Sequence, residues 1–284
     1  MSTNNKFPLR ILACSAAALV VLTIAARAED AGSSAAAPAS SATQSASPPA
    51  APAPVCSAPR ELTRFVHPLV RTARRLASGA PLVIVAVGSS STYGAGATSS
   101  AANYPSRLAV ELKQRFPGHD ITVLNRGVNG EETAQMLARF ATAVLAEHPD
   151  LVLWQVGTNS VMRDHSLLMH AVLLREGIAE LRNAGADVVL MDMQYVPKVL
   201  AKSETQGMED QLAIAAKQEN VDRFERFAIM RNWYEVQHIA FDAFTAPDQL
   251  HMNDWGYGCV AKLLADAIAE AATRPVASAA RSGR

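Results

Sequence analysis

Four short apolar runs recur along the central part of the chain. They are 82–87 (Leu-Val-Ile-Val-Ala-Val), 121–124 (Ile-Thr-Val-Leu), 151–154 (Leu-Val-Leu-Trp) and 188–191 (Val-Val-Leu-Met). Continuous apolar runs, as opposed to alternating ones, are typical of strands that are buried on both faces of a parallel sheet. The pattern therefore predicts four buried strands, and a weaker fifth strand near 221–225.

The segments around these runs have the spacing of amphipathic helices. Helical patterns occupy about 59–78, 103–116, 132–147, 166–184, 204–219 and 254–272. In the first of them we expect a kink at Pro68. Strands that alternate with helices predict right-handed crossovers and a parallel sheet covered on both faces. The fold class is therefore α/β, a three-layer α/β/α sandwich of the flavodoxin type with about five strands.

The ends of the chain have a different character. Residues 1–28 combine a short basic start, an apolar run and an Ala-Arg-Ala site, which is the pattern of a cleaved signal peptide. An uncleaved membrane anchor is the alternative. Residues 29–57 are rich in Ala, Ser and Pro and predict a disordered linker. We place the folded domain at 58–273 and a disordered tail at 274–284, and we expect an exported protein, periplasmic or secreted.

Composition excludes several classes of function. Of the 284 residues, 26 are Lys or Arg and 26 are Asp or Glu, so the zero net charge leaves no basic footprint for nucleic acid. The histidines show no metal-ligand spacing, and we expect neither a metal nor an organic cofactor. The Gly-rich stretch after the first strand lacks the motifs of dinucleotide and phosphate binding, and Thr92 breaks the Gly-x-Ser-x-Gly motif of α/β-hydrolases.

Polar groups that carry chemistry follow the predicted strands. Gly-Ser-Ser ends at Ser90 after the first strand, Gly130 follows the second, and Gly-Thr-Asn ends at Asn159 after the third. Asp248 and His251 precede the last helix. In a doubly wound sheet the carboxyl ends of the strands meet at one edge, where ligands bind. A serine, an amide and an acid–base pair are therefore expected in one crevice.

These blocks, in this order, resemble the SGNH (GDSL-type) hydrolase family over about 82–273. The resemblance implies that Ser90 is the nucleophile and that Asp248 and His251 are the acid and base of a triad. It also implies an oxyanion hole made by the Ser90 N–H, the Gly130 N–H and the Asn159 side chain. Singly, each residue has an ordinary reading as a helix cap, a turn residue or a surface side chain.

Two positions depart from the family pattern. Ser89 stands where the family has Asp before the nucleophile, and Ser160 stands where it has Asp after the oxyanion Asn. Neither group is required for the chemistry, because a base beside the serine and donors for the oxyanion suffice. The departures do weaken any inference about pocket polarity and substrate.

Further candidates rest on their position at the same edge. Substrate-pocket candidates, for which core packing is the competing interpretation, are Tyr93, Met162, Arg163, Gln194, Tyr195 and Trp255. After removal of the signal, the cysteines that remain are Cys56 and Cys259, and they form either a disulfide in an oxidising compartment or two buried thiols.

The sequence thus predicts an exported serine esterase that cleaves carboxylic esters through an acyl-enzyme. Its partner would be a small-molecule or glycan ester, with an O-acetylated envelope carbohydrate as the first hypothesis. The alternatives are a lipid-ester or thioester hydrolase, an acyltransferase of the same fold, or a non-catalytic carbohydrate-binding module.

Overall fold

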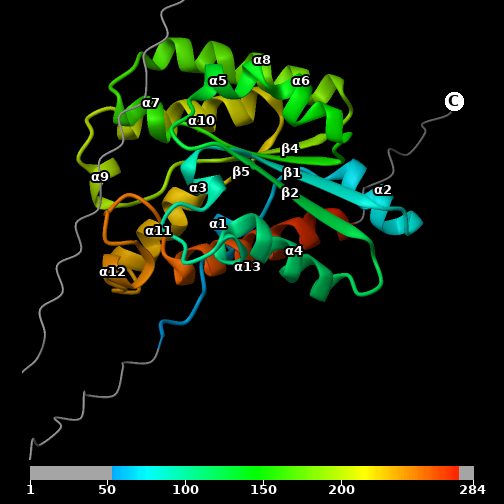
Figure 1. Ribbon diagram of the computed structural model, residues 1–284, viewed down its shortest axis with the longest axis horizontal. Helices are drawn as coiled ribbons and strands as arrows, with labels where there is room; N and C mark the ends of the chain where they lie inside the picture. The colour runs from blue at the N-terminus through cyan, green and yellow to red at the C-terminus, as the bar shows by residue number, and fades with distance from the viewer. Residues whose placement is uncertain (1–52, 275–284) are drawn as a thin grey trace, which may run out of the picture. The chain divides into compact units, whose positions relative to one another are not determined.

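A computed structural model describes residues 53–274, and it shows one parallel sheet between two layers of helices (Figure 1). The five strands lie in the order β2-β1-β3-β4-β5, and all neighbours are parallel. This is the flavodoxin-type order, so the predicted fold class is confirmed. The strands are β1 (Leu82–Gly88), β2 (Ile121–Gly127), β3 (Leu151–Gln155), β4 (Asp187–Met191) and β5 (Asp222–Phe224).

Helices cover both faces of the sheet. On one face α8 (Leu167–Asn183) packs against α5 (Thr133–Ala138) and α10 (Thr205–Glu219), and on the other α13 (Asp254–Thr273) packs against α4 (Tyr104–Arg115) and α2 (Val70–Ser78) (Figure 1). The shorter helices are α1 (Arg60–Thr63), α3 (Ser90–Tyr93), η1 (Ser100–Ala102), α6 (Phe140–Ala143), η2 (Leu145–Glu147), α7 (Thr158–Met162), α9 (Pro197–Leu200), α11 (Arg226–Glu235) and α12 (Phe241–Phe244). The three central strands are almost fully buried, which explains their continuous apolar sequence.

Two of the predicted helices are broken. In 59–78 the chain does not kink at Pro68 but leaves the helix between α1 and α2. There Phe65 is buried, and the Asp222 carboxylate accepts hydrogen bonds from the N–H groups of Val66 (2.6 Å) and His67 (3.0 Å). Proline also disfavours the helical conformation of the residue before it. Tertiary contacts therefore outweigh the periodic pattern.

The segment 132–147 forms α5, α6 and η2 instead of one helix. The first break is at Arg139, whose guanidinium pairs with Glu131 (2.6 Å) and donates to the Arg126 carbonyl oxygen (2.7 Å). These contacts tie the helix layer to the end of β2. The spacing of apolar residues shows only which face of a helix is buried, so it cannot predict an ion pair or a hydrogen bond of this kind.

The ends of the domain differ slightly from the predicted boundaries. Residues 54–57, which we assigned to the linker, contact the domain, and Arg274 donates to the carbonyl oxygens of Phe65 (2.7 Å) and Val66 (3.0 Å). The predicted signal peptide and most of the predicted linker lie outside the described residues. Within 53–274, no helix is long and apolar enough to cross a membrane.

Candidate active site

Ser90, His251 and Asp248 lie in hydrogen-bond contact at the carboxyl edge of the sheet. Ser90 Oγ is 2.9 Å from His251 Nε2, and His251 Nδ1 is 2.5 Å from Asp248 Oδ2. An ionised carboxylate only accepts, so Nδ1 carries the proton towards Asp248 and Nε2 is free to accept from the serine hydroxyl. Ser90 and His251, which are 161 residues apart in sequence, are thus in line for proton transfer, and Asp248 holds the far side of the imidazole.

The turn 248–251 fixes the acid relative to the base. Asp248 Oδ1 accepts from the backbone N–H groups of Leu250 and His251, each at 3.0 Å, while its other oxygen holds the imidazole. Burial favours the neutral acid, but these hydrogen bonds from His251 and Leu250 outweigh it and lower the pKa of Asp248 to about 2. Asp248 is therefore charged throughout the neutral range.

Ser90 is the first residue of α3, which follows β1 directly. The backbone of α3 lies so close to the end of β2 that a Cβ at Gly127 would be 2.1 Å from the Tyr93 nitrogen. Only glycine allows this approach. Asn125 holds α3 from the same strand, because its side-chain amide donates to the Thr92 carbonyl oxygen at 2.8 Å.

The predicted oxyanion groups come from two other strand ends. Gly130 lies in the loop after β2 with φ of +78°, a left-handed conformation that favours glycine. Asn159 is in α7, and its amide donates one hydrogen to the Glu131 carbonyl oxygen at 2.8 Å. The second amide hydrogen of Asn159 remains available to a ligand. Among the described residues, no acceptor pairs with the N–H of Ser90 or Gly130.

Glu132 connects these two oxyanion segments, and the sequence reasoning missed it. Its carboxylate accepts from Ser160 (3.2 Å), Arg163 (2.5 Å) and His165 (2.7 Å), all on or just after α7. Burial opposes its charge, but the hydrogen bonds from His165 and Arg163 outweigh it and lower the pKa of Glu132. The only sequence signal was a Glu three residues before a Gln at a helix start, the capping-box pattern.

Two of the predicted pocket residues lie towards the surface, and a third is partly buried. The Tyr93 side chain is exposed at the end of α3. Arg163 is half-exposed, and one of its nitrogens lies 3.5 Å from where a Cβ of Gly130 would be. Met162 is partly buried against the core. The assignment of Tyr93 and Arg163 to a substrate pocket stays a prediction.

The other three predicted pocket residues have different surroundings. Gln194 is 2% exposed, and its side chain bonds to Thr158, Leu250 and Arg226, so it faces the protein interior and not an open pocket. Tyr195 is also buried and donates to Glu235 at 2.6 Å. Trp255 packs edge-on against Trp233 and donates to the Pro54 carbonyl oxygen at 3.1 Å. Gln194 and Tyr195 follow the correct strand, but their side chains turn into the protein, and Trp255 is partly buried.

A cavity of about 580 Å³ lies beside the turn that carries Asp248, within the size range of ligand pockets. Pro247 and Gln249, on either side of Asp248, line it together with Pro197 of α9 and Phe241 of α12. Phe241 stacks on Tyr234, with ring centroids 4.0 Å apart. The sequence reasoning missed this cavity, because α9 and α12 are single turns without a readable period.

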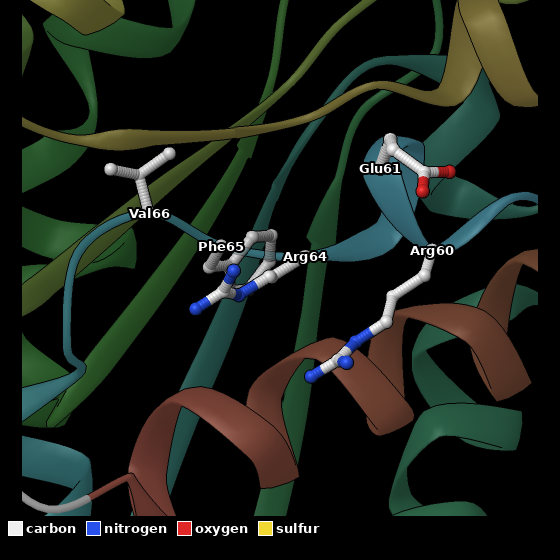
Figure 2. A pocket seen from close by; sticks show the side chains of 5 residues that line it. All are labelled: Arg60, Glu61, Arg64, Phe65 and Val66. Atoms are coloured by element: carbon white, nitrogen blue, oxygen red, sulfur yellow. The ribbon is translucent and has the colours of Figure 1, made fainter.

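A second cavity, of about 430 Å³, lies elsewhere on the domain (Figure 2). Arg60, Glu61, Arg64, Phe65 and Val66 line it, and the first of these pairs with Glu270 of α13 at 3.1 Å. No residue of the candidate site lines this cavity, and it contains no nucleophile with a neighbouring base. Among the described residues there is also no group of three or more His, Cys, Asp or Glu that could hold a metal ion.

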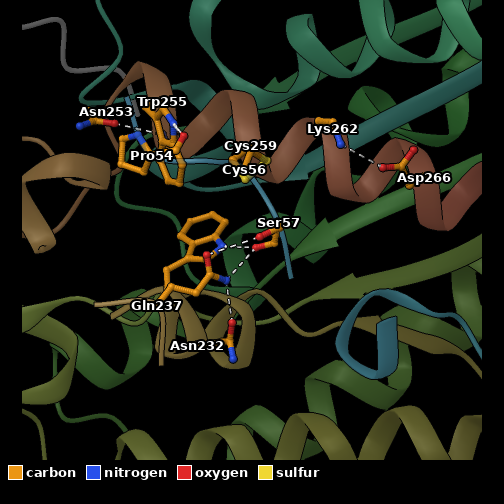
Figure 3. Close-up of a disulfide and its surroundings, with 12 residues drawn as sticks. Pro54, Cys56, Ser57, Asn232, Gln237, Asn253, Trp255, Cys259, Lys262 and Asp266 are labelled. Atoms are coloured by element: carbon orange, nitrogen blue, oxygen red, sulfur yellow. Dashed lines mark hydrogen bonds and ion pairs between the residues drawn. A yellow bond between two sulfur atoms is a disulfide. The ribbon is translucent and has the colours of Figure 1, made fainter. Parts of the chain in front are cut away.

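Cys56 and Cys259 form a disulfide, which joins the start of the domain to α13 (Figure 3). Around it, Ser57 accepts through its carbonyl oxygen from Trp233 (2.9 Å) and Gln237 (3.1 Å). Cys259 is buried in α13, one turn beyond Trp255. The entry of the chain into the domain is therefore fixed close to the helix that follows His251.

Comparison with known proteins identifies the family. Residues 55–274 match the Non-GDSL lipase-like family. The chain belongs to this family. The predicted resemblance to SGNH and GDSL-type esterases is confirmed at that level, and the Non-GDSL description agrees with Ser89 in place of the usual Asp.

Individual relatives of this Non-GDSL lipase-like protein are distant. An arylesterase from Vibrio mimicus is 32% identical over 95 residues, which are 34% of this chain and 46% of the relative. A two-domain esterase active on acetylated mannans has a TM-score of 0.63 at 19% identity, covering 75% of this chain and 56% of that one. This chain thus spans about half the length of each.

An acetylxylan esterase from Geobacillus stearothermophilus is similar over nearly its whole length. Its TM-score is 0.58 at 18% identity, and the match covers 66% of this chain and 94% of that one. At this identity the likeness shows a common fold.

Proposed function

We propose that this protein is a serine ester hydrolase in which Ser90 is the nucleophile. The observation that carries the proposal is the hydrogen-bonded line from Ser90 through His251 to Asp248, with distances of 2.9 Å and 2.5 Å. A serine hydroxyl is a weak nucleophile at neutral pH and needs an adjacent base, which this arrangement provides. The esterase names of the relatives support the same reaction class.

In the proposed reaction, His251 Nε2 takes the Ser90 proton while Oγ attacks the ester carbonyl carbon. Asp248 holds the imidazole in the required tautomer and stabilises the imidazolium. The imidazolium then protonates the departing alcohol, which leaves an acyl-enzyme on Ser90. Water, deprotonated by the same imidazole, attacks the acyl carbonyl and restores the free serine. The cycle needs no redox partner and no added group.

The developing oxyanion would receive hydrogen bonds from three donors. Two are the backbone N–H groups of Ser90 and Gly130, and the third is the free amide hydrogen of Asn159. Donors of this kind are worth about 3–4 kcal/mol each in the transition state because they are already oriented. The link from Asn159 to the Glu131 carbonyl oxygen at 2.8 Å supports this assignment, since it holds the amide beside the Gly130 loop.

As substrate we propose O-acetyl groups on carbohydrate. Two structural neighbours are esterases described as active on acetylated mannans and on acetylxylan. The cavity of about 580 Å³ beside the Asp248 turn, with the Phe241 ring in its wall, offers room for sugar residues next to the reacting ester. Apolar ring faces beside polar groups are a common way to hold a sugar.

We further propose that the protein is exported. The signal-peptide pattern of residues 1–28 supports this, and so does the disulfide between Cys56 and Cys259, because such bonds persist in oxidising compartments. The Ala/Ser/Pro-rich residues before Pro54 would then serve as a spacer between the envelope and the enzyme.

The test is hydrolysis of p-nitrophenyl esters from acetyl to palmitoyl by the purified full-length chain, with acetate release from acetylated xylan and mannan measured in parallel. We expect a preference for acetyl and loss of activity in Ser90→Ala. Ser89→Ala is the matched control, because the Ser89 hydroxyl bonds to Gln155 at 3.0 Å and not to His251.

Each outcome decides between the alternatives. Preference for long acyl chains would replace the carbohydrate substrate with a lipid ester. Acyl transfer to an added sugar in place of hydrolysis would make the protein an acyltransferase. Full activity in Ser90→Ala would refute the assigned nucleophile. Binding of glycans without hydrolysis, and without labelling of Ser90 by a fluorophosphonate, would show a non-catalytic module.

A further inference from the structure

Arg226, the first residue of α11, is fully buried behind the catalytic edge. Its guanidinium donates to the Ser91 hydroxyl and to the side-chain oxygen of Gln194 (3.0 Å). It also donates to the backbone carbonyl oxygens of Asp192 (2.5 Å) and Met193 (3.3 Å), just after β4. A buried arginine with this many partners is held in one orientation.

Gln194 extends the same set of contacts. Its side-chain oxygen accepts from Thr158 Oγ1 at 3.1 Å as well as from Arg226. Its side-chain nitrogen donates to the Leu250 carbonyl oxygen at 3.1 Å. Gln194 is 2% exposed and Thr158 is 4% exposed, so these bonds lie away from water.

Three of the residues that Arg226 and Gln194 contact share one property. Ser91, Thr158 and Leu250 each precede or follow a proposed catalytic residue, which are Ser90, Asn159 and His251 respectively. The contacts therefore reach α3 with Ser90, α7 with Asn159 and the turn 248–251 with His251.

We propose that Arg226 and Gln194 are positioning residues that set the relative placement of Ser90, Asn159 and His251. The inference rests on the proposed function, since it assigns no new reaction. Hydrogen bonds in a buried, low-dielectric network are strong and directional. The network therefore fixes α3, α7 and the turn 248–251 relative to one another. Misplacement of reacting groups by about 1 Å costs on the order of a hundredfold in rate.

The carboxylate of Asp192 compensates the charge of Arg226. Asp192 is fully buried and accepts from the Phe227 N–H at 2.9 Å. Arg223 pairs with Asp192 (3.1 Å) and with Glu209 (2.8 Å) in the same cluster. The cluster thus holds two arginines, of which Arg226 contacts the catalytic segments and Arg223 contacts the two acids.

This difference provides a matched control. Lysine at 226 keeps the charge but has a single nitrogen, which cannot reach acceptors on both Ser91 and Gln194 with the geometry of a planar guanidinium. We expect Arg226→Lys to lower kcat about tenfold to a hundredfold, with KM changed by less than about threefold. We expect Arg223→Lys to lower Tm about as much as Arg226→Lys does, because both variants disturb the same buried cluster. Arg223→Lys should nevertheless leave kcat within about threefold.

Two readouts do not need the natural substrate. One is the rate of Ser90 labelling by a fluorophosphonate. The other is the downfield proton signal of the imidazole hydrogen bond between His251 and Asp248. Both should change in Arg226→Lys and in Gln194→Met, and neither should change in Arg223→Lys. Gln194→Met keeps the side-chain volume and serves in place of Arg226→Lys if that variant does not fold.

The outcomes separate this inference from the proposed function. If the wild-type chain hydrolyses no ester and is not labelled, the serine mechanism fails and the positioning role fails with it. If the wild type is labelled but Gln194→Met keeps kcat within about threefold, the positioning role alone is refuted. An equal loss of kcat in the Arg226 and Arg223 variants would also refute it, because it would reflect general destabilisation.

Discussion

Asn159→Ala is the most direct probe of the proposed oxyanion hole. The Asn159 amide has two hydrogens, one given to the Glu131 carbonyl oxygen at 2.8 Å and one left for the oxyanion. Removing the side chain deletes a transition-state donor that is worth about 3–4 kcal/mol, so we expect kcat to fall about 10²- to 10³-fold. KM should change little, because the donor acts on charge that develops only during the reaction.

The same substitution has a separate effect on stability. It leaves the Glu131 carbonyl oxygen without its donor, and the loss of such a bond costs about 1–3 kcal/mol when the partner stays buried. Urea denaturation measures this cost, and kcat measured well below Tm separates it from the catalytic effect. The two numbers together test both roles of the side chain.

Asn159→Asp is the matched variant. It keeps the size of the side chain but places a second acceptor against the Glu131 carbonyl oxygen, so we expect a loss of kcat at least as large and a greater loss of stability. An Asn159→Ala protein that folds and retains kcat within about threefold would refute the assignment of Asn159 to the oxyanion hole. The hole would then consist of backbone N–H groups alone.

Three further predictions follow from contacts in the structure. Asp248→Asn should lower kcat about 10⁴-fold at pH 7, because a neutral amide stabilises neither the imidazolium nor the correct tautomer; activity within tenfold of wild type would contradict the triad. Reducing the bond between Cys56 and Cys259, which are 203 residues apart, should remove about 5 kcal/mol of stability and lower Tm by roughly 10–20 °C in calorimetry with reductant. An unchanged Tm with both thiols alkylated would disprove this. Burial lowers the pKa of His170 to about 4, so the unfolded chain binds the extra proton between about pH 6.5 and 4; stability should fall by up to about 3 kcal/mol as the pH drops through that window. Urea titrations of wild type and His170→Phe would show equal losses if that reasoning were wrong.

Much of the fold could be read from hydrophobic periodicity. The runs at 82–87, 121–124, 151–154 and 188–191 all lie within strands, and even the weak run near 221–225 contains β5. Burial on both faces requires nearly every residue of a central strand to be apolar, so the pattern is local and strong. The long helices α4, α8, α10 and α13 were located for the same reason, since each has one face on the core.

Periodicity failed where tertiary contacts set the backbone. The helix predicted at 132–147 is broken at Arg139, because this side chain reaches Glu131 and the end of β2. The 10-residue helix α11 was not predicted, and it begins at the buried Arg226. An arginine in a sequence is most often a surface residue, and only the acids and carbonyl groups around it allow its burial.

The sequence alone placed Ser90, Asn159, Asp248 and His251 at one edge, because each belongs to a short block that can be recognised locally and a parallel sheet brings the carboxyl ends of its strands together. Only the tertiary structure decided which side chains near this edge face solvent and which face the protein interior. Gln194 follows the right strand but is buried, whereas Glu132 and Arg226 contact segments far from them in sequence. The direction of a side chain depends on partners that come from other strands and helices, and no short stretch of sequence contains them.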